Sequence, residues 1–180
     1  MLARMTETTL PSPRLWTPAG FREDEWSRAD NAEALAGNGR FILPMQTFLD
    51  LDPEVRKSAR ERLGVELQPG DELKKIAGLL DHLSLVALVF PAFSDGRSFS
   101  KAELLRSRHG FNGAIRATGE VLIDQLPHML RLGFDEFEIK HPVLLRRLEA
   151  GLVGGLGFYY QPTGAPERAG EGYSWRRRPQ

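Results

Sequence analysis

The sequence predicts a single α/β domain: a mostly parallel sheet of about five strands in βα repeats, with flanking helices. Apolar stretches alternate with stretches of helical periodicity, which is the pattern of repeated β–α units. Residues 85–90 are apolar at every position, as in a central parallel strand that is covered on both faces. The chain has 180 residues, 41% of them hydrophobic, so it can bury one sizeable core.

The first two β–α units are short. Residues 40–45 form the first expected strand, and Pro44 indicates a sheet edge or a strand end because proline cannot donate to a ladder. Asp52 is followed by proline, the spacing of a helix N-cap and first helical position. Residues 65–67 alternate in polarity like a half-buried strand. Asp71 is then expected to cap an α-helix with one apolar stripe.

Three further units follow the expected central strand at 85–90. Ser100 and Glu103 have the spacing of a capping box, so a helix is expected to begin at Ser100. Residues 114–118 form the next expected strand, and the helix after it is expected to kink at Pro127. Residues 136–140 alternate like a half-exposed strand, and a final helix begins with the proline that follows them.

We expect three regions: an N-terminal extension over 1–38, the α/β domain over 39–160, and a flexible or docking tail over 161–180. The tail is rich in glycine and proline, a composition that favours irregular chain. Large aromatic side chains need a surface to cover. We therefore expect the termini to pack on the domain or to dock on a partner, because all three tryptophans lie outside residues 41–160: Trp16, Trp26 and Trp175.

Charge and composition argue against several classes of protein. The chain has 24 Lys and Arg against 24 Asp and Glu, which disfavours nucleic acid or an anionic membrane as partner. It has no cysteine, so it supplies no disulfide and no Cys ligand for zinc or an iron–sulfur cluster. The apolar run over 83–90 is too short to cross a bilayer, and the start of the sequence lacks the apolar core of a secretory signal. We expect a cytoplasmic protein.

Several enzyme motifs are missing from the sequence. It contains no P-loop, no G-x-S-x-G elbow and no H-E-x-x-H. The glycines of residues 151–157 follow a helix rather than a strand and lack dinucleotide-binding spacing. No spacing typical of metal ligands links the four histidines: His82, His109, His128 and His141. We expect no metal or cofactor bound by this chain, and the sequence leaves open whether it is an enzyme and whether it is a homo-oligomer.

Candidate site residues gather after the expected strands, because ligands of open parallel sheets bind beyond the carboxyl ends of the strands. Arg97 and Arg116 are expected to bind an anion or a partner, since guanidinium forks bind oxyanions and carboxylates. Asp95 and Glu120 are the candidate general bases. The remaining candidates for anion or partner binding are Ser100, Asp124 and Gln125.

The same residues also fit a purely structural interpretation. Residues 94–96 are an ordinary turn signal, and Ser100 could serve only as a helix cap. Asp95 with Arg97, or Arg116 with Glu120, could form mutual ion pairs. Solvent exposure explains Asp124 and Gln125 equally well. The sequence leaves both interpretations open.

Residues 90–139 also carry a family resemblance. They include Phe90-Pro91, Phe93, Asp95-Gly96-Arg97, Ser100, Leu104-Leu105-Arg106, Gly110, Gly113, Arg116-Ala117, Gly119, Val121-Leu122, Asp124-Gln125 and Gly133-Phe134. On these residues the chain resembles the bacterial family called domain of unknown function 934, with weaker similarity upstream to Leu63 and downstream to Gln161. Many relatives have Tyr at Phe99, Cys at Leu132 and Asp at Glu120, so neither a phenol nor a thiol at those places is essential in this chain.

The resemblance implies a role but no reaction. Members of that family are often encoded beside assimilatory sulfite reductase and other sulfate-assimilation enzymes, and are commonly labelled oxidoreductases. The resemblance therefore implies an accessory protein of sulfite reduction, with sulfite reductase or another enzyme of sulfate assimilation as its partner and a small oxyanion as a second candidate ligand. Two alternatives stay open: a stand-alone small-molecule enzyme with Asp95 or Glu120 as base, and a non-catalytic adaptor that works through its tail.

Overall fold

The computed structural model describes residues 12–92 and 94–154. Its centre is an eight-stranded sheet in the order β2-β1-β8-β7-β6-β5-β4-β3. Neighbouring strands from β3 to β8 are parallel, whereas β1 is antiparallel to both β2 and β8. The strands are β1 (Arg14–Thr17), β2 (Gly20–Arg22), β3 (Trp26–Arg28), β4 (Arg40–Pro44), β5 (Leu63–Leu67), β6 (Leu85–Phe90), β7 (Ala114–Gly119) and β8 (Glu136–Ile139).

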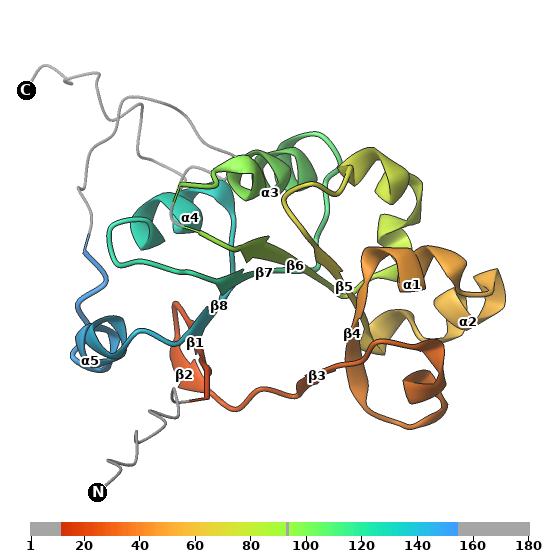
Figure 1. Cartoon of the computed structure of the whole chain (residues 1–180), viewed down its shortest axis with the longest axis horizontal. Coiled ribbons are helices and arrows are strands. Elements are labelled where there is room, and N and C mark those ends of the chain that lie inside the picture. Colours follow the sequence, from red (N-terminus) through yellow and green to blue (C-terminus); the bar gives the residue numbers. More distant parts are fainter. Residues whose placement is uncertain (1–11, 93, 155–180) are drawn as a thin grey trace, which may run out of the picture.

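Helices connect the strands and lie outside the curve of the sheet (Figure 1). The α-helices of the described residues are α1 (Met45–Asp50), α2 (Pro53–Ser58), α3 (Arg97–Ser107), α4 (Leu126–Leu132) and α5 (Pro142–Glu149). The 3-10 helices are η1 (Ala32–Ala36), η2 (Arg60–Arg62), η3 (Leu73–Lys75) and η4 (Ala77–His82). None of the helices in 12–92 and 94–154 has both the length and the apolar character that a membrane span requires.

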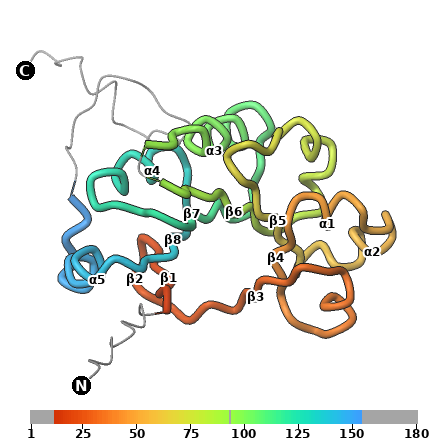
Figure 2. The backbone as a smooth tube through the Cα atoms, in the orientation of Figure 1, coloured from red at the N-terminus to blue at the C-terminus, as the bar shows by residue number. Residues whose placement is uncertain are grey.

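The sheet curls until its two edge strands approach each other (Figures 1 and 2). β2 pairs with β1 at one edge and β3 pairs with β4 at the other. Only three residues of chain separate the end of β2 at Arg22 from the start of β3 at Trp26. The sheet is therefore an almost closed ring, and its inner face is filled by side chains.

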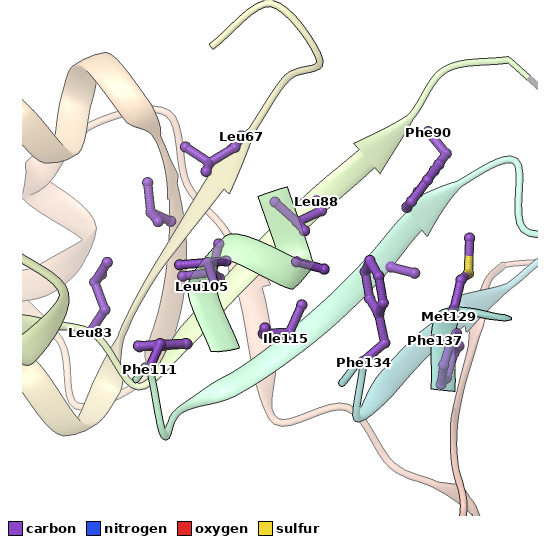
Figure 3. Close-up of a cluster of buried hydrophobic side chains, with 14 of the residues drawn as sticks. Leu67, Leu83, Leu88, Phe90, Leu105, Phe111, Ile115, Met129, Phe134 and Phe137 are labelled. Carbon is purple, nitrogen blue, oxygen red and sulfur yellow. The ribbon is translucent and has the colours of Figure 1, made fainter. Parts of the chain in front are cut away.

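The main hydrophobic core lies between the outer face of the ring and the helices. Leu88 and Phe90 of β6 belong to it, together with Leu105 of α3 and Met129 of α4 (Figure 3). Successive side chains of a strand point to opposite faces, so Leu85 and Ala87 lie on the inner face, where they pack with Ile42, Trp26 and Ala114. β6 is buried on both faces, which confirms its prediction as a central strand.

The prediction of about five strands is wrong in number, although all five expected strands are present as β4 to β8. The three additional strands lie within residues 14–28, in the segment predicted as an N-terminal extension. Each has only three or four residues, too few for a periodicity signal. Trp16 of β1 packs on Phe137 of β8 with ring centroids 5.5 Å apart. The predicted tail over 161–180 lies outside the described residues.

The predicted α-helix after Asp71 is instead the pair of 3-10 helices η3 and η4. Their hydrogen bonds run from residue i+3 to residue i, as from the amide of Ile76 to the carbonyl of Leu73. The Asp71 carboxylate accepts from the amide of Gln68 and does not cap a helix. Gly78 lies inside η4, and glycine disfavours a continuous α-helix.

Two predicted helix features are also corrected. α3 begins at Arg97 with Gly96 before it, so Ser100 lies inside the helix rather than at its cap. The hydroxyl of Ser98 donates to the carbonyl of Val89 and anchors this first turn to β6. Pro127 lies in the first turn of α4, where proline costs no hydrogen bond, so no kink follows.

Candidate functional site

Asp95 and Arg97 lie together at the carboxyl end of β6. Arg97 donates from Nε and Nη2 to the two carboxylate oxygens of Asp95 at 3.0 and 2.7 Å. The side chain of Arg97 is 64% exposed and that of Asp95 is 16% exposed. Hydrogen bonding from Arg97 lowers the pKa of Asp95, which makes this carboxylate a weaker base than an ordinary aspartate. Asp95 and Arg97 thus form the mutual ion pair that the purely structural interpretation of the sequence expects.

Lys101 is a buried cation close to this pair that the sequence analysis missed. Its Nζ donates to the carbonyl oxygens of Gln68 and Pro69 at 3.1 and 2.7 Å, and both carbonyls follow β5. Burial lowers the pKa of Lys101. The ammonium therefore ties α3 to the loop after β5. No sequence signal marks it, because a lysine in the first turns of a helix is ordinarily exposed.

The other candidates of this edge follow β7 or lie on α3. The amide of Glu120 donates to the carbonyl of Phe90 at 2.7 Å, so the carboxyl ends of β6 and β7 meet at one rim. The side chains of Glu120, Asp124 and Ser100 are exposed, and Gln125 is half-buried before α4. We call the carboxyl ends of β5, β6 and β7, with the start of α3, the strand-end rim.

Arg116 does not join Arg97 at the strand-end rim. Its side chain is fully buried on the inner face of β7. Nη1 and Nη2 donate end-on to the two carboxylate oxygens of Asp24 at 2.7 and 2.9 Å, and Nε donates to Glu136 at 2.8 Å. The expected anion site shared by Arg97 and Arg116 is therefore not formed, because carboxylates of the chain itself occupy Arg116.

Arg116 is the centre of a group of charged side chains that extends from the buried inner face of the ring to its surface. Arg28 donates from Nε to Glu66 at 2.8 Å and from Nη2 to Glu138 at 2.9 Å. Arg22 forms an ion pair with Glu136. Nη1 of Arg116 lies 3.4 Å from the carboxylate oxygen Oε1 of Glu138. We call the group the inner charge cluster: Arg22, Asp24, Arg28, Glu66, Arg116, Glu136 and Glu138.

Small residues on the inner face make room for the large charged and apolar side chains beside them. The strand register places Glu66, Ala87, Arg116 and Glu136 in one row across β5 to β8. Ala87 takes little space beside Arg116. At Gly64 a Cβ atom would lie 3.2–3.3 Å from the side chains of three neighbours on the inner face: Ile42, Trp26 and Leu85.

Glu136 and Glu138 correct the prediction of a half-exposed last strand, because both are buried in the ring. Their alternation with Phe137 is the same whether the polar face of a strand meets water or a charged interior. A single strand cannot distinguish these cases, since the difference depends on which distant residues cover that face. Asp24, which covers it, is 92 positions away from Arg116 in the sequence.

The carboxylates keep the buried guanidinium ionised. Burial by itself lowers the pKa of Arg116, but its hydrogen bonds to Asp24 and the charge of Glu136 outweigh this effect and raise the pKa. Arg28 follows the same pattern through Glu138. A buried charge that loses its partner is strongly destabilising, so the members of the cluster depend on one another. Over the residues that the structure describes, no group of three or more Asp, Glu or His is placed to hold a metal ion.

A comparison with protein families matches the part of the chain that contains four of the seven residues of the inner charge cluster. Residues 64–169 match the family described as "Bacterial protein of unknown function (DUF934)". The match includes the cluster residues of β5, β7 and β8, while Arg22, Asp24 and Arg28 precede it. A search of the curated proteins finds no significant match. Because the matched residues make up more than half of the chain, the protein belongs to this family.

Proposed function

We propose that this chain is an accessory protein of assimilatory sulfite reduction that binds sulfite reductase or another enzyme of sulfate assimilation. Membership of the family over residues 64–169 carries the proposal, because the resemblance implies that setting. The absence of cysteine from all 180 residues supports an accessory role, since a Cys-ligated iron–sulfur centre would have to belong to the partner.

The strand-end rim is the proposed contact for the partner. Arg97 is its most exposed cation, and Asp95 holds the guanidinium by two of its nitrogens. Nη1 lies outside this pair, on a side chain that is 64% exposed. Arg97 also begins the eleven-residue helix α3, and its own amide donates to the carboxylate of Asp95, which lies at the helix start where a negative charge is favourable. A carboxylate of the partner or a small oxyanion would bind at Nη1 of Arg97.

Lys101 and Asp95 would act as positioning residues for this contact. Lys101 fixes the start of α3 against the loop after β5 through two carbonyl oxygens. Asp95 sets the orientation of the Arg97 side chain. The lowered pKa of Asp95 supports this positioning role over a role as general base, because a strongly stabilised carboxylate accepts protons poorly.

Deletion of the gene tests the proposal in the cell. We expect the deletion strain to grow slowly with sulfate as sole sulfur source and normally with cysteine. We also expect an affinity-tagged chain to retain the reductase, and Arg97→Ala to release it. Arg108→Ala, an exposed arginine at the other end of α3, is the matched control and should retain it. Normal growth on sulfate together with no retained reductase would refute the proposal.

A further inference from the structure

We propose that the end-on fork of Arg116 is a binding site for a small anion with two available oxygens, and that Asp24 occupies this site in place of the ligand. The ligand class is a carboxylate or a tetrahedral oxyanion. This site lies inside the ring and is separate from the strand-end rim, so it does not depend on the proposed role in sulfite reduction.

The contacts of Arg116 differ between its two edges. Glu136 binds the Nε edge from β8, a strand paired in register with β7. Asp24 binds the Nη1–Nη2 edge with both oxygens, and it belongs to the short link between the two edge strands. This end-on bidentate pair is the geometry in which a guanidinium binds a free carboxylate or oxyanion.

The segment that carries Asp24 is a thin cover over buried charges. Residues 18–34, which we call the covering segment, contain no buried residue, although Arg116, Glu136 and Glu138 beneath them are almost completely buried. Short ladders to β1 and β4, the ion pairs of Arg22, Asp24 and Arg28, and the partly buried apolar side chains of the segment hold it in place. A segment without a fully buried side chain opens at a lower free energy than the core strands.

The chemistry of the fork requires an anion as the replacement for Asp24, because a guanidinium offers only N–H donors and a positive charge. With Asp24 the cluster has four carboxylates against the three guanidiniums of Arg22, Arg28 and Arg116. A bound anion would restore the charge count that Asp24 provides now. The Asp24 side chain is 33% exposed, so a ligand has access to the fork from the same side.

The first experiment measures Tm of Asp24→Ala in sodium formate, sodium sulfate and sodium chloride at equal ionic strength. Formate matches the carboxylate that the substitution removes, sulfate represents a tetrahedral oxyanion, and chloride reports screening alone. We expect a saturable rise of about 5 °C with formate, sulfate or both, and a smaller response to chloride. A response to only one of the two anions identifies which ligand class the fork accepts.

Wild type and Glu23→Ala are the matched controls. Glu23 is an exposed acid of the same segment, so its removal changes net charge equally but leaves the fork occupied by Asp24. We expect both controls to respond to formate and sulfate less than Asp24→Ala does, because in them the anion must compete with Asp24 for the fork. If Asp24→Ala responds to formate and sulfate no more than the controls do, Arg116 is not an anion site and the proposal fails.

A second experiment uses the wild-type chain and does not depend on the stability of the variant. Amide hydrogen exchange is measured after addition of the anion that stabilises Asp24→Ala. If that variant does not fold, sulfate and formate are tested in turn. We expect faster exchange in residues 18–34 than in chloride, with β5 to β8 unchanged, because the anion displaces Asp24. If the exchange rate in residues 18–34 does not depend on the anion, the anion does not displace Asp24 and the proposal is refuted. Neither experiment involves the reductase, so failure here leaves the proposed function to its own test.

Discussion

Gly119 ends β7 and is paired with Phe90 at the end of β6. Its φ is +87°, and a Cβ atom would lie 2.3 Å from the carbonyl oxygen of Phe90. We predict that Gly119→Ala lowers the free energy of unfolding by about 3 kcal/mol or more, since backbone strain and a steric clash add. Urea unfolding measures this loss.

Gly151→Ala separates the two causes. Gly151 also has a positive φ, of +73°, but a Cβ atom there would meet nothing within 4 Å. Strain alone should cost about 1 kcal/mol. Equal losses for the two substitutions would contradict the close approach of Gly119 to Phe90.

The Asp95–Arg97 pair predicts a specific titration. The pKa of Asp95 lies below its ordinary value of 3.8 because Arg97 hydrogen-bonds the carboxylate. A folded-state pKa below the unfolded one stabilises the fold above the unfolded value, and this contribution disappears as the pH falls through the folded-state pKa. We predict that Arg97→Ala returns the pKa of Asp95 toward its ordinary value.

Carboxyl carbon shifts in an NMR titration report the pKa of Asp95 directly. Arg108→Ala should leave the midpoint of Asp95 where it is in wild type. A midpoint that does not move in Arg97→Ala would show that the pair does not form in solution.

At the scale of elements, the sequence predicts the parallel part of the sheet well. β5 to β8 are found where their apolar runs and turn residues indicate, and β6 is buried on both faces as its six apolar residues require. These strands are determined locally, by alternation and by the helices that follow them. α5 likewise begins at the proline that predicts it.

The elements that the sequence misplaces are those that depend on distant partners. β1 and β2 are short, and β1 is paired to β8 across more than 100 residues. The first turn of α3 is set by Ser98 bound to Val89, and not by the local spacing of Ser100 and Glu103. Gly78 lies within η4, where an apolar stripe alone indicates an α-helix but glycine disfavours one.

Removal of the first three strands tests whether they are an appendage or part of the fold. We predict that a fragment of residues 39–180 lacks a cooperative unfolding transition. In that fragment β8 loses its pairing with β1, Phe137 loses its contact with Trp16, and Arg116 loses Asp24. Near-ultraviolet circular dichroism and thermal unfolding measure the loss.

A fragment of residues 12–180 is the matched control, since it keeps every contact that the structure describes. It should unfold cooperatively. If the 39–180 fragment unfolds with the same midpoint and cooperativity, the three N-terminal strands are dispensable and the ring is not a structural unit.

At the scale of the whole molecule, the ring is completed by charged side chains rather than by a backbone ladder between β2 and β3. This explains why the candidate site could be predicted only in part. Asp95 and Arg97 are neighbours in sequence and lie together at the rim. Arg116 is buried because it lies on the inner face of β7 and because Asp24 binds it there. The residues next to Arg116 in the sequence do not indicate either feature.

A double-mutant cycle of Asp24→Ala and Arg116→Met is the decisive measurement for this closure. Urea unfolding of wild type, both single variants and the double variant gives the coupling free energy between the two side chains. The exposed pair Glu25–Arg40 provides a reference cycle, for which about 0.5 kcal/mol is expected. For Asp24 and Arg116 we predict a coupling of about 2 kcal/mol or more, because Arg116 is fully buried. A coupling no larger than that of the reference pair would contradict closure of the ring by Asp24.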